Sequence, residues 1–221
     1  MNIKANLSII ALVSANLIPL IGVLFFDWNA ILVLALFWIE NLIIGGFNII
    51  KLISLGIYKK DPKAFSSCLF FIFHYGAFCS IHGMTLWDIL GLGDLDSSTY
   101  FSFEWIGVSY IFGEGATVLF AFVDKFQPQI WLGIAALSMS HFVSFIENFI
   151  LRGGIFTSKT NKLMSQPYAQ IFIMHIGLIL GAFVVEKLGS PLWLLLIIIT
   201  FKIAVDFMQH KRRHNKRVNQ G

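Results

Sequence analysis

The chain has 221 residues, of which 57% are hydrophobic and only 13% charged, and its mean hydropathy is +0.78. A soluble domain is about half apolar and about a quarter charged, so this composition excludes a soluble enzyme, a secreted disulfide scaffold and a disordered tail. The formal net charge of +4 comes from basic residues at the ends of apolar runs, which is typical of membrane anchors and not of a nucleic-acid-binding face.

Six apolar segments are each long enough to cross about 30 Å of hydrocarbon as an α-helix. They cover residues 7–26, 29–50, 64–86, 128–151, 167–185 and 191–209. The first has no clear cleavage site, so we interpret it as an uncleaved span. Pro128, Pro167 and Pro191 stand where helices are expected to start, because the missing N–H of proline costs little there. The segments predict one all-α transmembrane bundle over residues 1–210, followed by a basic tail over residues 211–221.

A seventh apolar stretch, residues 105–123, carries Glu114 between two glycines. If this stretch does not cross and the N-terminus is cytoplasmic, Lys125 and Lys187 are the only basic residues on the outer side, as the positive-inside rule favours. The sequence therefore predicts six spans with both termini cytoplasmic, and an outer-surface or re-entrant helix over residues 101–126. Seven spans are the alternative.

Ionisable side chains at the centre of a span cost about 2.5–3.5 kcal/mol each on insertion scales. The chain nevertheless keeps Glu40, Glu147, Lys202 and Asp206 within its predicted spans. The spans also contain imidazoles and amides, at His74, His82, His141, His175, Asn41, Asn48 and Asn148. A protein of modest stability loses such groups unless something compensates them, so they indicate either function or hydrogen bonding between helices.

Four of these residues are expected at a similar depth in the membrane. Glu40, His74 and His141 each lie eleven residues from a basic residue at the inner end of their span, which places them about 16 Å from the boundary at about 1.5 Å per residue. His175 lies about 12 Å deep by the same arithmetic, measured from Pro167. Imidazole nitrogens and a carboxylate at one level are groups that Zn²⁺ or Fe²⁺ takes as ligands from facing helices.

We therefore predict a divalent metal site, with Zn or Fe bound by His74, His141, His175 and Glu40. Such a site would support hydrolysis of a membrane substrate, with Glu40 as the fourth ligand or as the general base, and Lys202 or His82 as an oxyanion or proton partner. Residues expected to orient the ligands or to relay protons are Asp206, His210, His82, Asn41 and Asn148. No HExxH or CxxC motif identifies the metal.

Three alternatives stay open. In a proton- or ion-coupled transporter the polar residues would form a path from the inner to the outer face of the membrane, starting at His210, Asp206 and Lys202. No inverted repeat is visible in the sequence. Two of the midplane histidines could instead hold a b-type haem. In a structural or partner-binding protein, the same polar groups would be hydrogen-bonding contacts between helices.

Short motifs in five of the spans carry a resemblance to a known family. They are Trp38-Ile39-Glu40-Asn41, His74-Tyr75-Gly76 with Phe78 and His82-Gly83, Ser140-His141 with Ser144-Phe145, Pro167-Tyr168 with His175, and Lys202, Asp206 and His210 at four-residue steps. With these motifs the chain resembles a family of bacterial polytopic membrane proteins of unassigned function. It departs from that family's pattern at Arg152, near which an acidic residue is expected, and at Gln170, where a basic one is expected.

The resemblance implies a multi-pass protein of the bacterial inner membrane. A weaker resemblance, without matching motif spacings, is to seven-helix zinc hydrolases of the alkaline ceramidase and adiponectin receptor type, and it implies that such a site could hydrolyse a lipid. The expected partners are the lipid bilayer and, at the basic tail, anionic lipid headgroups. A homo-oligomer stays open, and nucleic acid is not expected.

Overall fold

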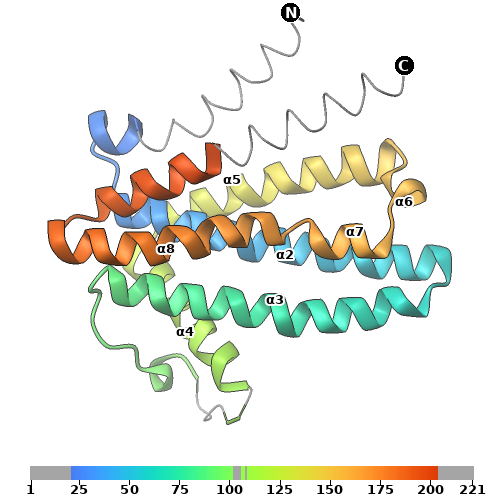
Figure 1. Cartoon of the computed structure of the whole chain (residues 1–221), viewed down its shortest axis with the longest axis horizontal. Helices are drawn as coiled ribbons and strands as arrows, with labels where there is room; N and C mark the ends of the chain where they lie inside the picture. The colour runs from blue at the N-terminus through green and yellow to red at the C-terminus, as the bar shows by residue number, and fades with distance from the viewer. Residues whose placement is uncertain (1–20, 102–105, 108, 204–221) are drawn as a thin grey trace, which may run out of the picture. The chain divides into compact units, whose positions relative to one another are not determined.

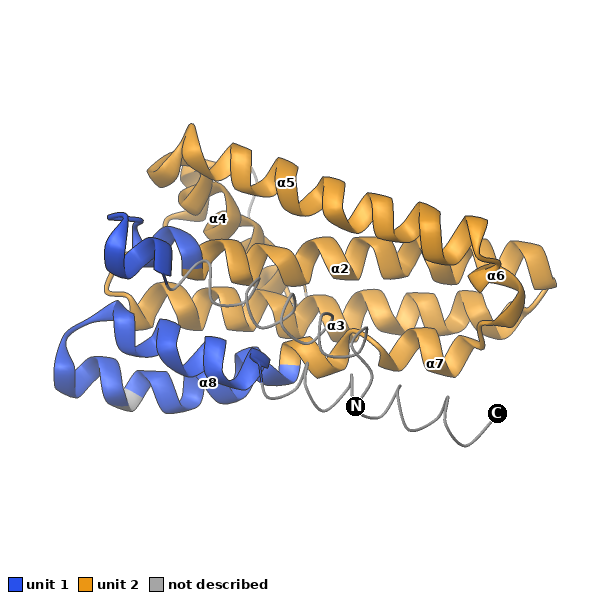
Figure 2. Ribbon diagram, turned by 90° about the horizontal axis from the view of Figure 1, so that it is seen from above, with its two compact units in different colours: residues 1–33, 172–221 blue, residues 34–171 orange. Residues whose placement is uncertain are grey.

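The structure, a computed structural model, describes residues 21–101, 106–107 and 109–203. Within these residues every regular element is a helix and none is a strand, which confirms the predicted all-α fold. The chain divides into two compact units, residues 1–33 with 172–221 (unit 1) and residues 34–171 (unit 2) (Figure 2).

Unit 2 contains most of the described helices. They are α2 (Ala30–Lys59, of which the first four residues belong to unit 1), α3 (Pro62–Ile89), η1 (Ser97–Thr99), α4 (Ser109–Phe126), α5 (Gln129–Ser144), the π-helix η2 (Phe145–Leu151), α6 (Gly154–Thr157) and α7 (Thr160–Ser165). In Figure 1, α2, α3 and α5 run along the same direction, and α4 crosses that direction obliquely. Unit 1 contains most of α8 (Tyr168–Leu188), whose first four residues belong to unit 2, and a shorter apolar helix, Pro191–Ile203.

Four helical segments are long and apolar enough to cross a membrane, namely Ala30–Lys59, Pro62–Ile89, Gln129–Leu151 and Thr160–Leu188. They correspond to four of the six predicted spans, and they identify the chain as a membrane protein. The last predicted span is described only as far as Ile203, and the first lies almost entirely outside the described residues. The total of six spans therefore stays a prediction.

The turn between the first two of these helices is much shorter than the predicted spans suggested. α2 continues to Lys59 and α3 begins at Pro62, whereas the predicted spans ended at residue 50 and resumed at residue 64. Lys51, which served as the boundary, lies inside α2 with a partly covered side chain, because a lysine can extend its ammonium group along a helix toward the aqueous interface. Asp61 caps α3, with its carboxylate accepting from the backbone N–H of Lys63 at 3.0 Å.

The packing of α2 on α3 depends on Trp38. Its indole N–H donates to the backbone carbonyl of Cys79 at 2.8 Å, and the residue is only 1% exposed. The ring lies against Gly83, where even a single added Cβ would collide with it. Small residues of this kind let two membrane helices approach closely, so Trp38 and Gly83 together fix the α2–α3 contact that positions Glu40.

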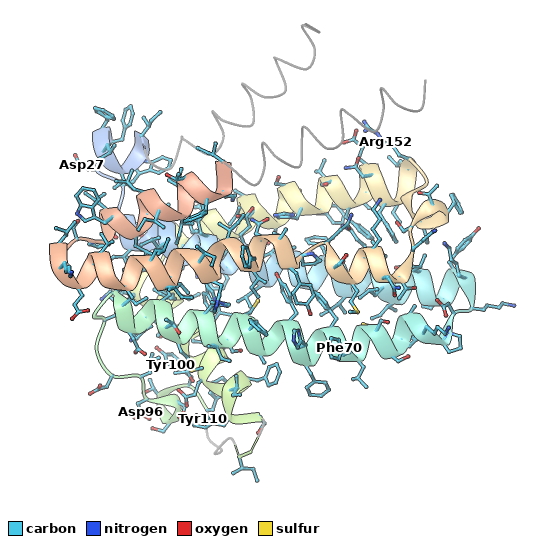
Figure 3. The ribbon with its side chains drawn as sticks, in the orientation of Figure 1. Asp27, Phe70, Asp96, Tyr100, Tyr110 and Arg152 are labelled. Atoms are coloured by element: carbon cyan, nitrogen blue, oxygen red, sulfur yellow. The ribbon has the colours of Figure 1, made fainter. Side chains whose placement is uncertain are left out.

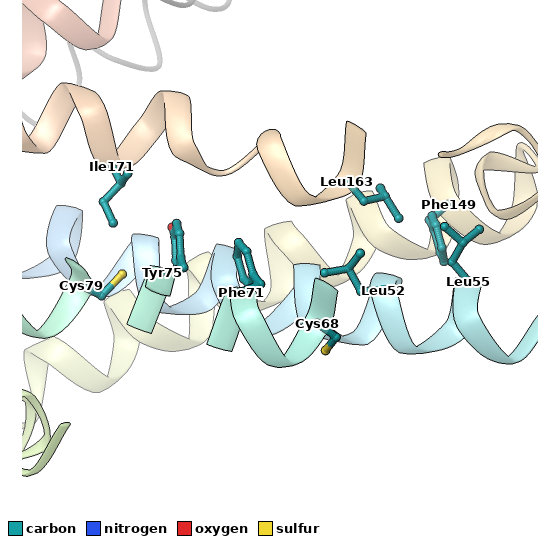
Figure 4. Close-up of a cluster of buried hydrophobic side chains, with 9 residues drawn as sticks. All are labelled: Leu52, Leu55, Cys68, Phe71, Tyr75, Cys79, Phe149, Leu163 and Ile171. Atoms are coloured by element: carbon teal, nitrogen blue, oxygen red, sulfur yellow. The ribbon is translucent and has the colours of Figure 1, made fainter. Parts of the chain in front are cut away.

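A cluster of buried side chains continues this interface along unit 2 (Figure 4). Its members are Leu52, Leu55, Cys68, Phe71, Tyr75, Cys79, Phe149, Leu163 and Ile171. Both cysteines of the chain, which lie on the single helix α3, are buried in it and free. The cluster joins α2 and α3 to η2 and α7, so the π-helix that follows His141 is anchored by Phe149.

α4 forms within the stretch for which an outer-surface or re-entrant helix was predicted. It packs on α3 at Gly115, where an added Cβ would lie 2.9 Å from the Cα atom of Ser80. Trp87 and Phe122 extend this contact with their rings edge to face at 5.0 Å. Among the described helices, α4 is not one of the four that are long and apolar enough to cross a membrane.

Candidate functional site

Two of the four predicted metal ligands meet inside unit 2. Glu40 on α2 and His141 on α5 place Oε1 and Nε2 3.5 Å apart, with side chains 13% and 28% exposed. The ring of Phe47 lies beside the imidazole, with the two centroids 6.3 Å apart. A carboxylate and an imidazole from two membrane helices are thus in contact and largely covered by the rest of the chain.

The distance between these two atoms carries chemical information. It exceeds the 2.7–3.2 Å that an N–H···O hydrogen bond usually spans. Two donor atoms on one tetrahedral Zn²⁺, each bonded at about 2.0–2.1 Å, lie about 3.4 Å from each other. The distance is thus compatible both with an ion pair and with two ligands of one ion.

The helix that carries His141 changes character one turn later. α5 continues into the π-helix Phe145–Leu151. Turns of π-helix are rare and are often found at functional sites. The Asn148 amide, predicted to support the site, donates to the Ser144 carbonyl at 3.0 Å and lies 3.3 Å from its hydroxyl. Asn148 is therefore engaged with its own helix, and Glu147 accepts from Arg152.

His74, a third predicted ligand, contacts the side chain of Tyr168. Its Nδ1 lies 2.8 Å from the hydroxyl oxygen of Tyr168, the first residue of α8, and the tautomer of the imidazole decides which group donates. The ring also stacks on Phe70, with centroids 5.0 Å apart. Tyr168 belongs to the Pro167-Tyr168 motif, so the sequence singles out this residue. It gives no indication that the tyrosine hydroxyl reaches His74 on α3.

Two buried amides of α2 have unsatisfied atoms. Asn41 donates its Nδ2 to the carbonyl of Phe37 at 2.8 Å, while its Oδ1 and the Nδ2 of Asn48 have no hydrogen-bond partner among the described residues. His82, one of the predicted proton partners, is also buried, at 4% exposure, and its ring lies 6.0 Å from that of Phe78. A buried polar atom left without a partner lowers the stability of the fold by about 1–3 kcal/mol. These amide atoms of Asn41 and Asn48 could therefore bind water or a polar ligand.

The other predicted site residues lie elsewhere in the chain. His175 on α8 and Lys202 on the helix Pro191–Ile203 belong to unit 1. Within that unit the two helices pack through glycines, with Gly177 against Ile198. Asp206 and His210 lie outside the described residues.

In the part of the chain that the structure describes, no three His, Cys, Asp or Glu side chains are grouped closely enough to hold a metal ion. Unit 2 thus brings together a pair of metal-binding groups, Glu40 and His141, and the three-histidine centre stays a prediction. The pair could bind an ion with further ligands, exchange a proton, or connect α2 to α5.

Comparisons with known proteins bear on the family and not on the activity. The searches of curated proteins and of solved structures return no match. One family model, described as a family of unknown function (DUF6498), matches residues 2–220. Because the match covers nearly the whole chain, the protein belongs to this family of unknown function (DUF6498).

Proposed function

We propose that the protein is a multi-pass protein of the bacterial inner membrane, with both termini cytoplasmic, that binds Zn²⁺ or Fe²⁺ through Glu40 and His141. The observation that supports this function best is the 3.5 Å separation of Glu40 Oε1 and His141 Nε2, the spacing of two ligands of one tetrahedral ion. A carboxylate and a neutral imidazole are also the donor types that these ions prefer.

A stable site needs at least one further protein ligand. His175 of α8 is kept as a proposed ligand, because counting residues along the sequence gives it a depth similar to that of Glu40 and His141. His74 remains a proposed ligand as well, and its contact with Tyr168 is the kind of hydrogen bond that fixes the tautomer of a metal-binding imidazole. Glu40 and His141 with one of these two histidines would make three protein ligands and leave a fourth position for water or substrate, as catalytic zinc sites do.

The chemistry that suits such a site is hydrolysis of a membrane substrate. The ion would supply a polarised carbonyl and a water of lowered pKa. If the three histidines hold the ion, Glu40 would instead act as the base that accepts the proton of that water, and Lys202 is the residue predicted to offset negative charge on the substrate oxygen. Asp206, His210 and His82 are proposed to connect this region to water on either side.

Metal analysis of the full chain, purified without chelators, tests the proposal. We expect about one equivalent of a transition metal in the wild type and less than about a fifth of one in His141→Ala and Glu40→Gln. His214→Ala removes an imidazole from the predicted tail and is the matched control, with metal content unchanged. Less than about a tenth of an equivalent in the wild type would exclude the metal site.

A second function, proton-coupled transport, is favoured by one observation. Glu40 and His141 are both titratable, and they touch within the membrane-spanning segments, as the members of a proton relay do. Proteoliposomes that dissipate a pH gradient in a Glu40-dependent manner, with protein that contains no metal, would support transport in place of metal binding.

A further inference from the structure

One end of unit 2 is formed by two segments that are far apart in the sequence. The Lys59 ammonium group donates to the carbonyl of Ser158 at 2.6 Å. The Thr160 hydroxyl donates to the carboxylate of Asp61 at 3.2 Å. Figure 1 shows the turn between α2 and α3 beside the α6–α7 region at this end. The α2–α3 turn and residues 152–162 therefore make one surface, which we call the basic end.

The basic end carries an excess of positive charge. Its basic residues are Lys59, Lys60, Lys63, Arg152, Lys159 and Lys162. Its acid, Asp61, accepts from the N–H of Lys63 and from the hydroxyl of Thr160. Arg152, labelled in Figure 3, pairs with Glu147 of the neighbouring η2. Within the described residues no ion pair joins the other four exposed lysines to a carboxylate, and these are Lys60, Lys63, Lys159 and Lys162.

Lys60 occupies a position that normally belongs to glycine. The N–H groups of Lys60 and Asp61 donate to the carbonyls of Ile57 and Gly56, which is the bond pattern of a Schellman motif at the end of α2. The residue after the helix in this motif adopts a left-handed conformation, and Lys60 has φ +52°. Any side chain with a Cβ atom is disfavoured there, so a lysine at this place is better explained by its charge than by the fold.

The basic end also lies at one end of all four candidate spans. The candidate spans Ala30–Lys59 and Gln129–Leu151 end there, and Pro62–Ile89 and Thr160–Leu188 begin there. Tyr58 and Phe156 stand at the same end, 54% and 59% exposed, with ring centroids 5.2 Å apart. Exposed aromatic rings at helix ends are typical of the headgroup region of a membrane.

From these observations we propose that the basic end is a docking surface for the headgroups of anionic phospholipids. Within the described part of the chain, the lysines of this surface have no acidic partners, and they stand beside aromatic rings at the ends of the spans. They can therefore bind the phosphodiester group of a lipid whose acyl chains lie along the helices. The surface belongs to unit 2, consists of residues other than those of the predicted C-terminal tail, and does not depend on the metal site.

Native mass spectrometry of the full chain, with equal amounts of phosphatidylglycerol and phosphatidylcholine of the same acyl chains, tests the proposal. We expect phosphatidylglycerol to be retained preferentially by the wild type. The double variant K60Q/K162Q should lower this preference by about fivefold for each lysine removed. The matched control K125Q/K187Q removes two exposed lysines from the last turns of α4 and α8 and should leave the preference unchanged.

The variant Lys60→Gly separates lipid binding from folding. It removes the charge and places the residue best suited to a left-handed position. We expect its melting temperature in phosphatidylcholine to equal or exceed that of the wild type, while its preference for phosphatidylglycerol falls. An unchanged preference in Lys60→Gly and K60Q/K162Q would overturn the proposal. Displacement of phosphatidylglycerol by an equal concentration of inorganic phosphate would also overturn it, since the surface would then be a site for free anions.

Discussion

Nε2 of His141 lies 3.5 Å from Oε1 of Glu40, although the two residues are a hundred positions apart and come from different helices. The contact joins α2, which Trp38 fixes against α3, to α5 just before its π-helical end. Glu40 therefore lies two residues from Trp38, which is buried and hydrogen-bonded to α3, and His141 stands on the helix that changes its geometry at Phe145. This arrangement suits a site in which one ligand is fixed and the other can adjust.

Replacing Glu40 by histidine should preserve metal binding, whereas replacing it by alanine should abolish it. Histidine restores a donor atom at the same position, and Zn²⁺ accepts either oxygen or nitrogen. The measurement is the zinc content of Glu40→His and Glu40→Ala after identical purification. Equal zinc in both variants would show that position 40 is not a ligand.

Removal of the Trp38 hydrogen bond should destabilise the protein. Trp38→Phe keeps an aromatic ring but removes the 2.8 Å hydrogen bond to the carbonyl of Cys79, at a cost of about 0.5–1.5 kcal/mol. Thermal unfolding in a fixed detergent should show a lower melting temperature. Trp131→Phe is the control, because Trp131 is 53% exposed and its replacement should have little effect.

Two glycine substitutions should have opposite effects. Gly115→Ala places a Cβ atom 2.9 Å from the Cα atom of Ser80, so α4 must move away from α3, at about 1–3 kcal/mol. Gly46 of α2 has no atom within 4 Å of an added Cβ, and alanine there favours the helix by about 1 kcal/mol. The melting temperature is expected to fall in Gly115→Ala and to be equal or higher in Gly46→Ala. The reverse order would contradict the α3–α4 packing.

Tyr168→Phe should test the role of His74. The variant removes the hydroxyl 2.8 Å from His74 Nδ1 and should cost about 0.5–1.5 kcal/mol of stability. If the tyrosine orients a metal-binding imidazole, metal affinity should also fall, by about tenfold or more. Tyr110→Phe, which changes a tyrosine that is 54% exposed, should alter neither quantity. A loss of stability with unchanged metal affinity would restrict His74 to a structural contact.

The turn at residues 96–99 should respond to acid. The hydrogen bonds that Ser98 gives to the Asp96 carboxylate hold its pKa below the ordinary value of 3.8. Because the folded pKa is the lower one, the stabilisation is complete above about 3.8 and is lost as the pH falls through the folded pKa. The Ser98 amide resonance should therefore titrate with a midpoint below 3.8, and Asp96→Asn should remove this titration. A midpoint at or above 3.8 would contradict the hydrogen bond.

Hydropathy predicted the helical class and the four long helices of the structure, because burial in lipid requires the backbone to bond within each segment. It placed the end of α2 at residue 50, because Lys51 served as the boundary of the span. The signal that ends α2 and starts α3 is Asp61-Pro62, a capping residue followed by a proline at the first helical position. Apolar runs locate the hydrocarbon and not the ends of helices, which can project beyond it.

The candidate site was predictable in part. Counting residues from the span ends placed Glu40 and His141 at similar depth, and the structure brings them together. The same count could not give the rotation of each helix about its axis, which depends on contacts such as Trp38 on Gly83. For that reason it gave no indication that His74 would meet the hydroxyl of Tyr168.

The claim that Glu40 and His141 are ligands of one ion is tested most directly by X-ray absorption at the zinc edge, on full-length protein loaded with one equivalent of Zn²⁺. The account predicts a first shell of nitrogen and oxygen at about 2.0–2.1 Å with scattering from imidazole rings, and one ring fewer in His141→Ala. A zinc spectrum identical in the wild type, His141→Ala and Glu40→Gln would contradict it.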